Sequence, residues 1–325
     1  MSEIVDVPLG MHILEMEITS KCNLNCIHCY NRNDGLAELP VSKIIELIDF
    51  AEKSCVSKMV FSGGEAVLHS QFVDLVRHLS KRPKSKMKRV LHSNGFVKYV
   101  DIEDLRVFDI VHLSFELDET GVRVTPQKDI IAQALRLKEA GIYCYFFATI
   151  HSKNIHRIED MVNLANDIGV NIAFNMYVDI NDNGQLCMGL EKVKEVTIKL
   201  HGYFTEGKIL RYTSPLVSIV SQQRSAEFIG IKGGCTAGIA ACAVKANGDV
   251  IPCPFLRVKS GNIFENNMRD IWFNSEVFKT LRRRYDYQGQ CGECEYLSYC
   301  GGCRARSLKT NGILNGDDPA CFKNL

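Results

Sequence analysis

The sequence lacks the long apolar run that a membrane-spanning helix needs, since a stretch such as Ile142–Ala148 is far shorter than the ~18 residues of a span. It also has almost no net charge, with 39 Lys and Arg against 38 Asp and Glu, which disfavours nucleic acid or a membrane surface as a partner. The first residues, including Glu3 and Asp6, do not form a basic segment followed by an apolar one, so no secretory signal is expected. These absences predict a cytoplasmic protein without nucleic-acid or membrane partners.

The sequence does have 14 cysteines in 325 residues. A chain of this length can bury a full core, so a disulfide framework is not needed, and clustered cysteines point instead to bound metal. Their positions fall into an N-terminal set, a C-terminal set and a scattered set: Cys22, Cys26 and Cys29; Cys235, Cys242, Cys253, Cys291, Cys294, Cys300, Cys303 and Cys321; and Cys55, Cys144 and Cys187. The three scattered cysteines have no other cysteine at the spacing typical of metal ligands, and we expect them to behave as small buried hydrophobic residues.

Residues 13–201 alternate short apolar runs with amphipathic helical segments. The expected strands are 14–18, 58–61, 90–92, 110–115, 142–150 and 170–178. Three of the expected helices are 40–53, 128–140 and 191–201. Another contains the apolar positions Phe72, Leu75, Val76 and Leu79, and a fifth ends at Ile168. Gly141 and Gly169 end two of these helices. Repeated strand–helix units predict an α/β fold with a parallel sheet. Six units are too few for a closed eight-stranded barrel, so we expect a partial (β/α)6 barrel of the TIM type.

Residues 235–325 are rich in glycine and cysteine and poor in continuous apolar sequence. A strand is expected at 249–251 and a helix around 271–284. Metal clusters could supply the folding energy that a small core does not. We therefore expect a partial barrel in residues 1–201, a bridge of unassigned structure in 202–234, and a small cysteine-rich domain in 235–325.

The N-terminal cysteines directly follow the first expected strand, at the edge of the sheet where α/β sites form. Three thiolates would leave one iron of an iron–sulfur cluster open, and a zinc loop is the alternative. Gly63-Gly64-Glu65 ends the second strand at the same edge. The two glycines allow a ligand close to the backbone, and the carboxylate can accept a hydrogen bond from an ammonium group; alone, such a triplet could be a simple turn.

The segments Cys22-Asn-Leu-Asn-Cys26-Ile-His-Cys29-Tyr30 and Gly63-Gly64-Glu65 resemble those of the radical S-adenosylmethionine (SAM) enzymes, over about residues 13–200. The resemblance implies a [4Fe-4S] cluster on the three cysteines, with SAM chelated by the open iron. It implies SAM contacts from Gly63, Gly64, Glu65, Ser93, Asn94, Gly95, Ser114 and Tyr30. Two positions depart from the family pattern: Ala66 replaces a common proline, and Glu116 replaces an aspartate one methylene shorter.

The C-terminal pattern is Cys235-x12-Gly248-x4-Cys253, then Cys291-x2-Cys294-x5-Cys300-x2-Cys303, then Cys321. Eight thiolates suit two fully ligated [4Fe-4S] clusters, although two zinc sites could use similar spacings. The pattern resembles the SPASM extension of radical SAM enzymes. This implies one auxiliary cluster on Cys235, Cys242, Cys253 and Cys303, and another on Cys291, Cys294, Cys300 and Cys321. The spacing between Cys300 and Cys303 is one residue shorter than usual, which leaves open which of the two auxiliary clusters each of these cysteines binds. Because eight cysteines would leave no open iron in the auxiliary clusters, we expect both clusters to relay electrons or to have a structural role.

The resemblance implies three [4Fe-4S] clusters, reductive cleavage of SAM to a 5′-deoxyadenosyl radical, and hydrogen abstraction from a substrate. It also implies a low-potential electron donor such as flavodoxin or ferredoxin. A ribosomally made peptide or a protein side chain is the first expectation for the substrate, a tetrapyrrole of a haem pathway or another small molecule is the second, and a non-catalytic iron–sulfur or zinc scaffold is a distant third.

About a dozen residues precede the first expected strand, so we expect any leader peptide to be recognised by a separate protein. Polar side chains on or just after the strands are candidates for contact with the substrate. The catalytic candidates are Glu116, Tyr145, Tyr177 and Asp179, and His112 and His151 occupy similar positions.

Overall fold

The computed structural model describes residues 10–31, 35–83, 85–117, 121–123, 125–180, 184–221 and 234–325. Its first six strands are β1 (Ile13–Thr19), β2 (Lys58–Gly63), β3 (Lys88–Ser93), β4 (Ile110–Ser114), β5 (Cys144–Ile150) and β6 (Asn171–Met176). All six are parallel and neighbour one another in chain order. The predicted α/β fold with a parallel sheet is confirmed.

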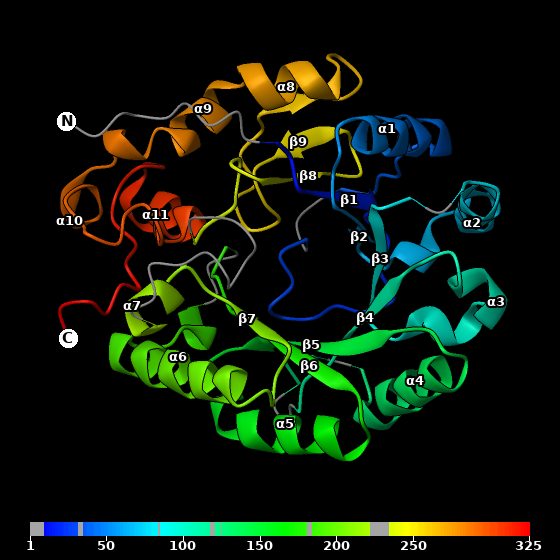
Figure 1. Cartoon of the computed structure of the whole chain (residues 1–325), viewed down its shortest axis with the longest axis horizontal. Helices are drawn as coiled ribbons and strands as arrows, with labels where there is room; N and C mark the ends of the chain where they lie inside the picture. Colours follow the sequence, from blue (N-terminus) through cyan, green and yellow to red (C-terminus); the bar gives the residue numbers. More distant parts are fainter. Residues whose placement is uncertain are drawn as a thin grey trace.

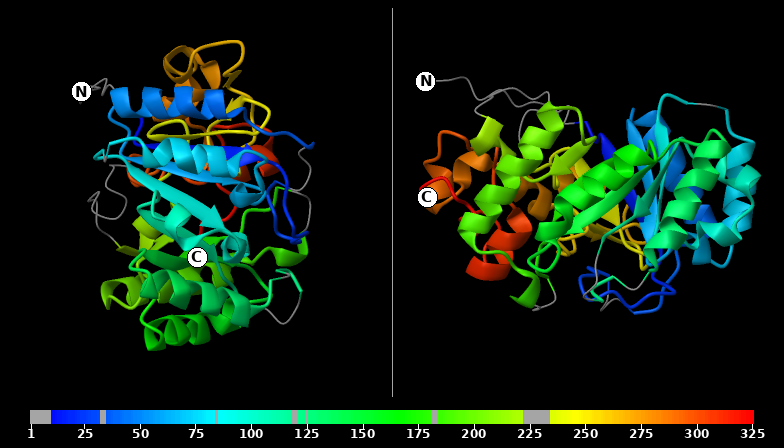
Figure 2. Two further views of the ribbon diagram at one scale, coloured as in Figure 1. Left: turned by 90° about the vertical axis from the view of Figure 1, so that its right-hand side faces the viewer. Right: turned by 90° about the horizontal axis from the view of Figure 1, so that it is seen from below.

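Helices cover the outer side of this curved sheet, which forms an incomplete barrel (Figures 1 and 2). They are α1 (Val41–Lys53), α2 (Phe72–Ser80), α3 (Ile102–Leu105), α4 (Gln127–Glu139), α5 (Ile158–Asp167) and α6 (Leu190–Thr205). The same views show the carboxyl ends of the strands and the loops that follow them at one mouth of the barrel.

The apolar periodicity of the sequence accounts for how the helices pack. On α1, Ile44, Leu47, Ile48 and Ala51 are buried, and each fully buried leucine or isoleucine side chain contributes ~1.5–3 kcal/mol. The four apolar positions expected on the second helix are likewise the buried residues of α2. Gly141 and Gly169 follow α4 and α5 with φ values of +70° and +64°, so both glycines end their helices in the left-handed region, as expected.

The sheet continues beyond the six predicted strands. At one end β7 (Arg211–Thr213) pairs with β6, and at the other end β8 (Ala241–Val244) runs parallel to β1. Two antiparallel strands follow, β9 (Asp249–Ile251) and β10 (Gly261–Asn262). The bridge expected at 202–234 therefore contains β7 and also α7 (Val217–Ser221), while its residues 222–233 lie outside the described part.

The remaining helices belong to the cysteine-rich segment and are α8 (Met268–Asn274), α9 (Glu276–Arg282), α10 (Gly289–Gly292) and α11 (Arg304–Asn311). The single helix expected around 271–284 is two helices, because Ser275 between them is extended, with φ −60° and ψ 127°. Trp272 and Phe278, one from each helix, pack edge to face with centroids 5.3 Å apart.

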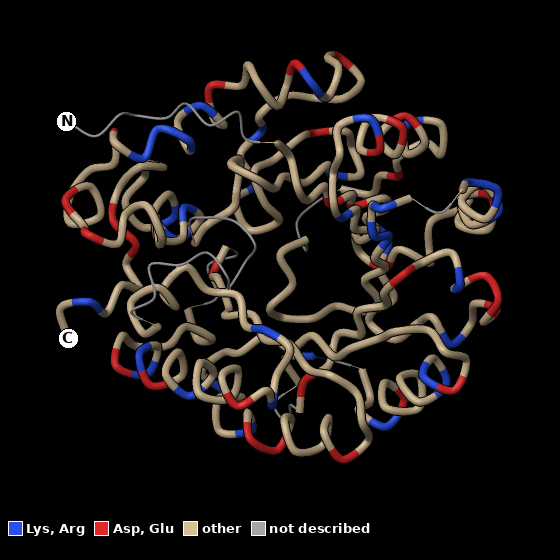
Figure 3. Tube along the Cα trace, in the orientation of Figure 1, with Lys and Arg blue, Asp and Glu red and all other residues tan. Residues whose placement is uncertain are grey.

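Lys and Arg alternate with Asp and Glu along the outer helices, so neither sign of charge dominates that surface (Figure 3). Within the described residues, no helix is long and apolar enough to span a membrane.

Candidate functional site

The three N-terminal cysteines line one cavity at the mouth of the barrel. Its volume is about 160 Å³, and its wall includes Cys22, Cys26 and Cys29 from the loop after β1. The Cys22 Sγ accepts hydrogen bonds from the Leu24 backbone N–H at 3.4 Å and from the Asn94 side-chain amide at 3.6 Å. The loop after β3 thus contacts the cysteine loop directly.

Two glycines bring the loop after β2 against the loop after β1. The Gly64 N–H donates to the Thr19 carbonyl, and the Glu65 N–H donates to the Lys21 carbonyl, both at 2.8 Å. A Cβ on Gly63 or Gly64 would overlap the carbonyl oxygen of Thr19 or Lys21. Gly63 also has a φ of +137°, a region that glycine occupies readily. Both glycines line the cavity, so the backbone itself is open to a ligand there.

Glu65 joins two of these loops. Its carboxyl group is buried, and Oε2 accepts a hydrogen bond from the Asn94 backbone N–H at 2.7 Å. Oε1 is also buried and has no hydrogen-bond partner among the described residues. Burial raises the Glu65 pKa to about 7, although hydrogen bonds from Asn94 and Ser93 oppose this change. A buried acceptor without a donor is costly, and an ammonium group is one donor that would satisfy it.

The other SAM contacts implied by the resemblance also gather here. Ser93, Asn94, Ser114 and Tyr30 line the same cavity as the cysteines, whereas Glu65 is not among its lining residues. Gly95 follows Asn94 with a φ of +101°.

The cavity fits an iron–sulfur cluster. Burial raises the pKa of the Cys22 and Cys29 thiols, and neighbouring cysteines of the triplet raise it further. Such thiols become thiolates when a metal binds them. Among the described residues, no three Cys, His, Asp or Glu side chains converge on a point suited to one ion. A cluster instead requires thiols arranged around a space, which is how the triplet lies.

A buried ion pair supports the cysteine loop from inside the barrel. Arg123 donates to the Glu116 carboxylate at 3.2 Å and lies 3.1 Å from Nε2 of His28, which belongs to the cysteine loop. Burial alone would raise the Glu116 pKa, but the charge of Arg123 and the interaction with His28 more than offset it and lower this pKa to about 2. Arg123 also interacts electrostatically with Cys26 and Cys29.

A second contact joins the cysteine loop to the C-terminal segment. The Arg257 guanidinium donates to both carboxylate oxygens of Glu17, at 2.9 and 3.0 Å, and to the Asn31 side-chain oxygen at 3.3 Å. Phe255 packs edge to face on Tyr30, with centroids 5.6 Å apart. Phe255 also lines the cavity, so the C-terminal segment forms part of the site's wall.

The four catalytic candidates are placed differently from one another. Glu116 and Tyr145 are buried and do not line the cysteine cavity, whereas Tyr177 does. Tyr177 donates to the Asp179 carboxylate at 3.0 Å, and both residues line a neighbouring cavity of about 440 Å³. His151 is fully buried, with Nε2 3.7 Å from Glu116.

Sequence reasoning missed several residues of the site. His28, Arg123, Phe147, Thr149, Asn175 and Phe255 all line the cavity. The position of His28 between two cysteine ligands was an available signal, and so was that of Phe255, two residues after Cys253. Arg123 lies in a segment without a recognisable pattern.

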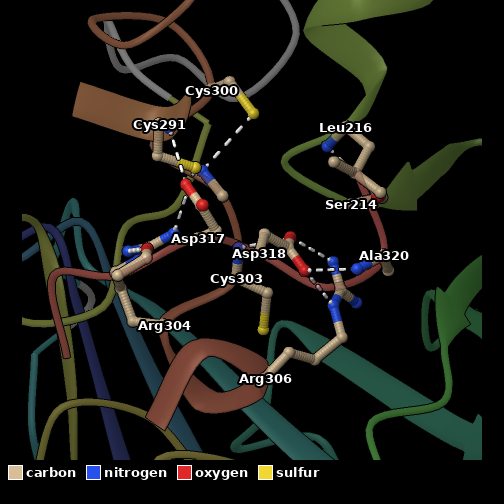
Figure 4. Close-up of polar contacts among 12 residues, drawn as sticks. Ser214, Leu216, Cys291, Cys300, Cys303, Arg304, Arg306, Asp317, Asp318 and Ala320 are labelled. Carbon is tan, nitrogen blue, oxygen red and sulfur yellow. Dashed lines mark hydrogen bonds and ion pairs between the residues drawn. The ribbon is translucent and has the colours of Figure 1, made fainter. Parts of the chain in front are cut away.

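The structure brings together the four cysteines assigned to the second auxiliary cluster. Cys291, Cys294, Cys300 and Cys321 line one cavity of about 430 Å³. Asp317 accepts from the Cys291 N–H at 2.8 Å, and Asp318 accepts from the Cys303 N–H at 2.7 Å (Figure 4). Asp318 also pairs with Arg306 through two hydrogen bonds of 2.7 Å. These backbone contacts fix where the cysteines lie.

Three of the four cysteines assigned to the other auxiliary cluster lie close together. Burial raises the pKa of the Cys253 thiol, and interactions with Cys235 and Cys303 raise it further. Cys242 has a different environment in β8: its Sγ lies 3.8 Å from the Met11 thioether, and the charged group that acts on it is Arg282. A ligand role for Cys242 stays a prediction.

The scattered cysteines differ in exposure. Cys144 is buried, and its thiol points to the Ala134 carbonyl at 3.6 Å. Cys55 and Cys187 are exposed, so the expectation of small buried hydrophobes holds for Cys144 but is wrong for these two.

Comparisons with known proteins identify the family of this chain. The sequence profile of the Radical SAM superfamily matches residues 16–165, and that of the SPASM iron–sulfur cluster-binding domain matches residues 235–295. The chain is therefore a member of the radical SAM superfamily that carries a SPASM domain. Proteins of this kind are enzymes that use SAM and [4Fe-4S] clusters.

Relatives in this family have different named activities. An AdoMet-dependent heme synthase of Methanosarcina barkeri is 28% identical, and the match covers 95% of this chain and 96% of that protein. The mycofactocin maturase MftC of Mycobacterium tuberculosis is 25% identical, over 98% of this chain and 84% of that protein. The structure of Streptococcus suis SuiB bound to its precursor peptide SuiA superimposes with a TM-score of 0.77 at 19% identity, covering 96% of this chain and 76% of that one. The likeness to SuiB supports the fold.

Proposed function

We propose that this enzyme reductively cleaves SAM and uses the resulting radical to abstract hydrogen from a ribosomally made peptide or a protein side chain. The observation that carries the proposal is the single cavity shared by Cys22, Cys26 and Cys29 with Gly63, Gly64, Ser93, Asn94 and Ser114. The group bound there, a [4Fe-4S] cluster with SAM, would supply a 5′-deoxyadenosyl radical. The protein's own residues hold, orient and enclose these groups.

Each loop has a distinct part in this proposal. Cys22, Cys26 and Cys29 would hold the cluster, and the bare backbone of Gly63 and Gly64 would let the methionine end of SAM lie close. Glu65 keeps the loop after β3 in place through the Asn94 N–H. Phe147 and Phe255 give the cavity an apolar wall, which limits water near a reactive intermediate.

We further propose three [4Fe-4S] clusters, with the C-terminal pair in a relay or structural role. The domain limits proposed for these parts are 1–201, 202–234 and 235–325. Electrons would come from a low-potential donor such as flavodoxin or ferredoxin, since cluster potentials can be strongly negative. A separate protein could present a peptide substrate.

A peptide substrate is supported by the maturase MftC among the relatives and by the SuiB–SuiA complex among structures of the same fold. A tetrapyrrole is the second candidate. The observation that favours it is the 28% identity to a heme synthase over nearly the full length of both chains.

Anaerobic reconstitution with iron and sulfide, followed by incubation with SAM and dithionite, tests the chemistry. We expect about 12 Fe per chain, four for each of three clusters, and release of 5′-deoxyadenosine detected by mass spectrometry. Cys26→Ala should lose about four Fe and all 5′-deoxyadenosine. Cys55→Gly is the matched control, because this exposed cysteine has a φ of +54° that glycine accepts; it should behave as the wild type. Zinc in place of iron would contradict the proposal.

Deuterated substrates separate the two classes. The reconstituted enzyme is supplied with one of two deuterated substrates. The first is a deuterated peptide encoded beside the gene, and the second is an iron tetrapyrrole with deuterated propionate groups. Deuterium that appears in 5′-deoxyadenosine identifies the substrate. Transfer from the tetrapyrrole alone would replace the first candidate by the second.

A further inference from the structure

A cluster of polar aromatic side chains lies inside the barrel beside the cysteine cavity. His92 on β3 pairs with His112 on β4, and His112 pairs with Tyr145 on β5. Their rings are in contact, with centroids 4.3 Å apart for His92 and His112 and 4.0 Å apart for His112 and Tyr145. His92 also lines the cysteine cavity, together with Phe147. The cluster therefore adjoins the candidate site through His92.

Two cationic side chains adjoin these rings. Arg211 on β7 donates from Nη2 to the Tyr145 hydroxyl at 3.0 Å, and its guanidinium lies 5.8 Å from the Phe147 ring centroid. Lys58, at the start of β2, interacts electrostatically with Arg211, and both charges act on His92. Among the described residues, neither cation forms an ion pair with a carboxylate. The region therefore has an uncompensated positive charge.

Several polar atoms in this region lack partners. Both ring nitrogens of His112, Nε2 of His92 and Nε of Arg211 are buried without a hydrogen bond to any described residue. His112 is only 3% exposed. Buried polar groups are nearly always paired, and leaving one unpaired costs about 1–3 kcal/mol. A cluster with this many open positions is suited to binding another molecule.

The chemistry of the cluster selects an anion. Burial and the neighbouring cations lower the His92 pKa to about 3 and the His112 pKa well below its ordinary value. Both imidazoles are therefore neutral near pH 7, and each has one N–H to donate. Arg211 adds a planar guanidinium, whose geometry matches a carboxylate, and Lys58 adds a positive charge. A cationic ligand would meet repulsion from both.

We propose that His92, His112 and Arg211, with Lys58 nearby, bind a carboxylate group of the substrate inside the barrel. This inference rests on the proposed function, since it gives the substrate an anionic anchor beside the SAM cavity. Peptides and tetrapyrroles both have carboxylates, so the anchor serves either class.

Propionate is a suitable probe because it is a small carboxylate. Line broadening of its methyl proton signal is measured by NMR against the anaerobically reconstituted enzyme with saturating SAM, at constant ionic strength. SAM is included so that its own carboxylate already occupies its site. We expect saturable broadening with the wild type, and at least about tenfold weaker binding with Arg211→Gln. Arg77→Gln is the matched control, because Arg77 is 61% exposed on α2; it should bind as the wild type.

Lys58→Gln is the second variant, since it leaves the buried rings and Arg211 in place and keeps the test valid if Arg211→Gln does not fold. It should also weaken propionate binding. Propionamide, the neutral analogue, should not bind. The proposal is overturned if propionate shows no saturable broadening, if propionamide binds equally well, if neither variant weakens binding, or if inorganic phosphate binds more tightly than propionate. The NMR signal does not depend on turnover, so failure of the SAM chemistry would be seen separately as missing 5′-deoxyadenosine.

Discussion

The Glu116 carboxylate lies between the cysteine loop and the barrel interior, where it accepts hydrogen bonds from Arg123 and from the Thr149 N–H, both at 3.2 Å. Since its folded pKa is near 2 rather than 4.5, ionised Glu116 stabilises the fold. This contribution is fully present above about pH 4.5 and is lost as the pH falls through 2.

Glu116→Gln should therefore lower the free energy of unfolding by about 3 kcal/mol near pH 7, because Arg123 would stay buried without its counter-charge. Thermal unfolding under anaerobic conditions measures this as a lower Tm. Asp74→Asn removes an exposed ion pair with Arg77 and should cost less than about 1 kcal/mol. Equal losses of stability for the two substitutions would show that the buried ion pair contributes no more than the exposed one.

The environment of Cys242 bears on whether this cysteine binds an auxiliary cluster. Its thiol lies 3.8 Å from the Met11 thioether, and Cys235 and Cys303 influence the thiol of Cys253, whereas the charged group that acts on Cys242 is Arg282. Cys242→Ser should therefore lose less iron on reconstitution than Cys253→Ser. Iron and sulfide analysis of the two variants decides the point. Equal losses would establish Cys242 as the fourth ligand of that cluster.

Residue types and spacing predicted which residues gather at the candidate site but not the environment of each side chain. The cysteine triplet and Gly63-Gly64-Glu65 are local patterns, and they meet at one cavity. The ion pair of Glu116 depends on Arg123, which comes from a loop without periodicity. No sequence pattern could show that this carboxylate, which follows a strand, would pair with an arginine inside the protein instead of facing a substrate.

At the scale of elements, the loops after β1 and β2 approach so closely that only glycine fits between them. Gly64→Ala should push the two loops apart, with loss of the iron bound by the N-terminal cysteines and little 5′-deoxyadenosine formed. Gly202→Ala on α6 is the control, since a Cβ there meets no atom within 4 Å; it should be neutral or stabilise the helix by up to about 1 kcal/mol. Full iron content in Gly64→Ala would contradict this account.

The six barrel strands were predictable because each is a short apolar run, and an amphipathic helix follows every one of them except β3. Of the added strands, the one expected at 249–251 is confirmed as β9, whereas β7, β8 and β10 were not predicted. β7 has three residues, Arg211, Tyr212 and Thr213, with no apolar run, and β8 reads Ala-Cys-Ala-Val within a cysteine-rich stretch. Their strand conformation depends on pairing with β6 and β1, a tertiary contact that local sequence does not encode.

At the scale of the whole molecule, the C-terminal segment completes the sheet as well as the site. Removal of residues 235–325 would expose the edge of β1 that pairs with β8 and would remove Arg257 from Glu17. An uncovered edge strand pairs readily with other chains. The truncated protein should therefore aggregate, as measured by light scattering after size-exclusion chromatography. A monodisperse truncated chain would show that β1 tolerates an open edge.

The pairing of β1 with β8 also has a consequence for synthesis of the protein. Ile13 pairs with Ala241, so the first strand emerges from the ribosome long before its neighbour exists. At about 5–20 residues per second, that delay is on the order of ten seconds or more. During this interval the edge of β1 that pairs with β8 stays open, next to the cysteine loop that follows the strand. Efficient production should therefore depend on chaperones that shield the amino-terminal part until translation is nearly finished.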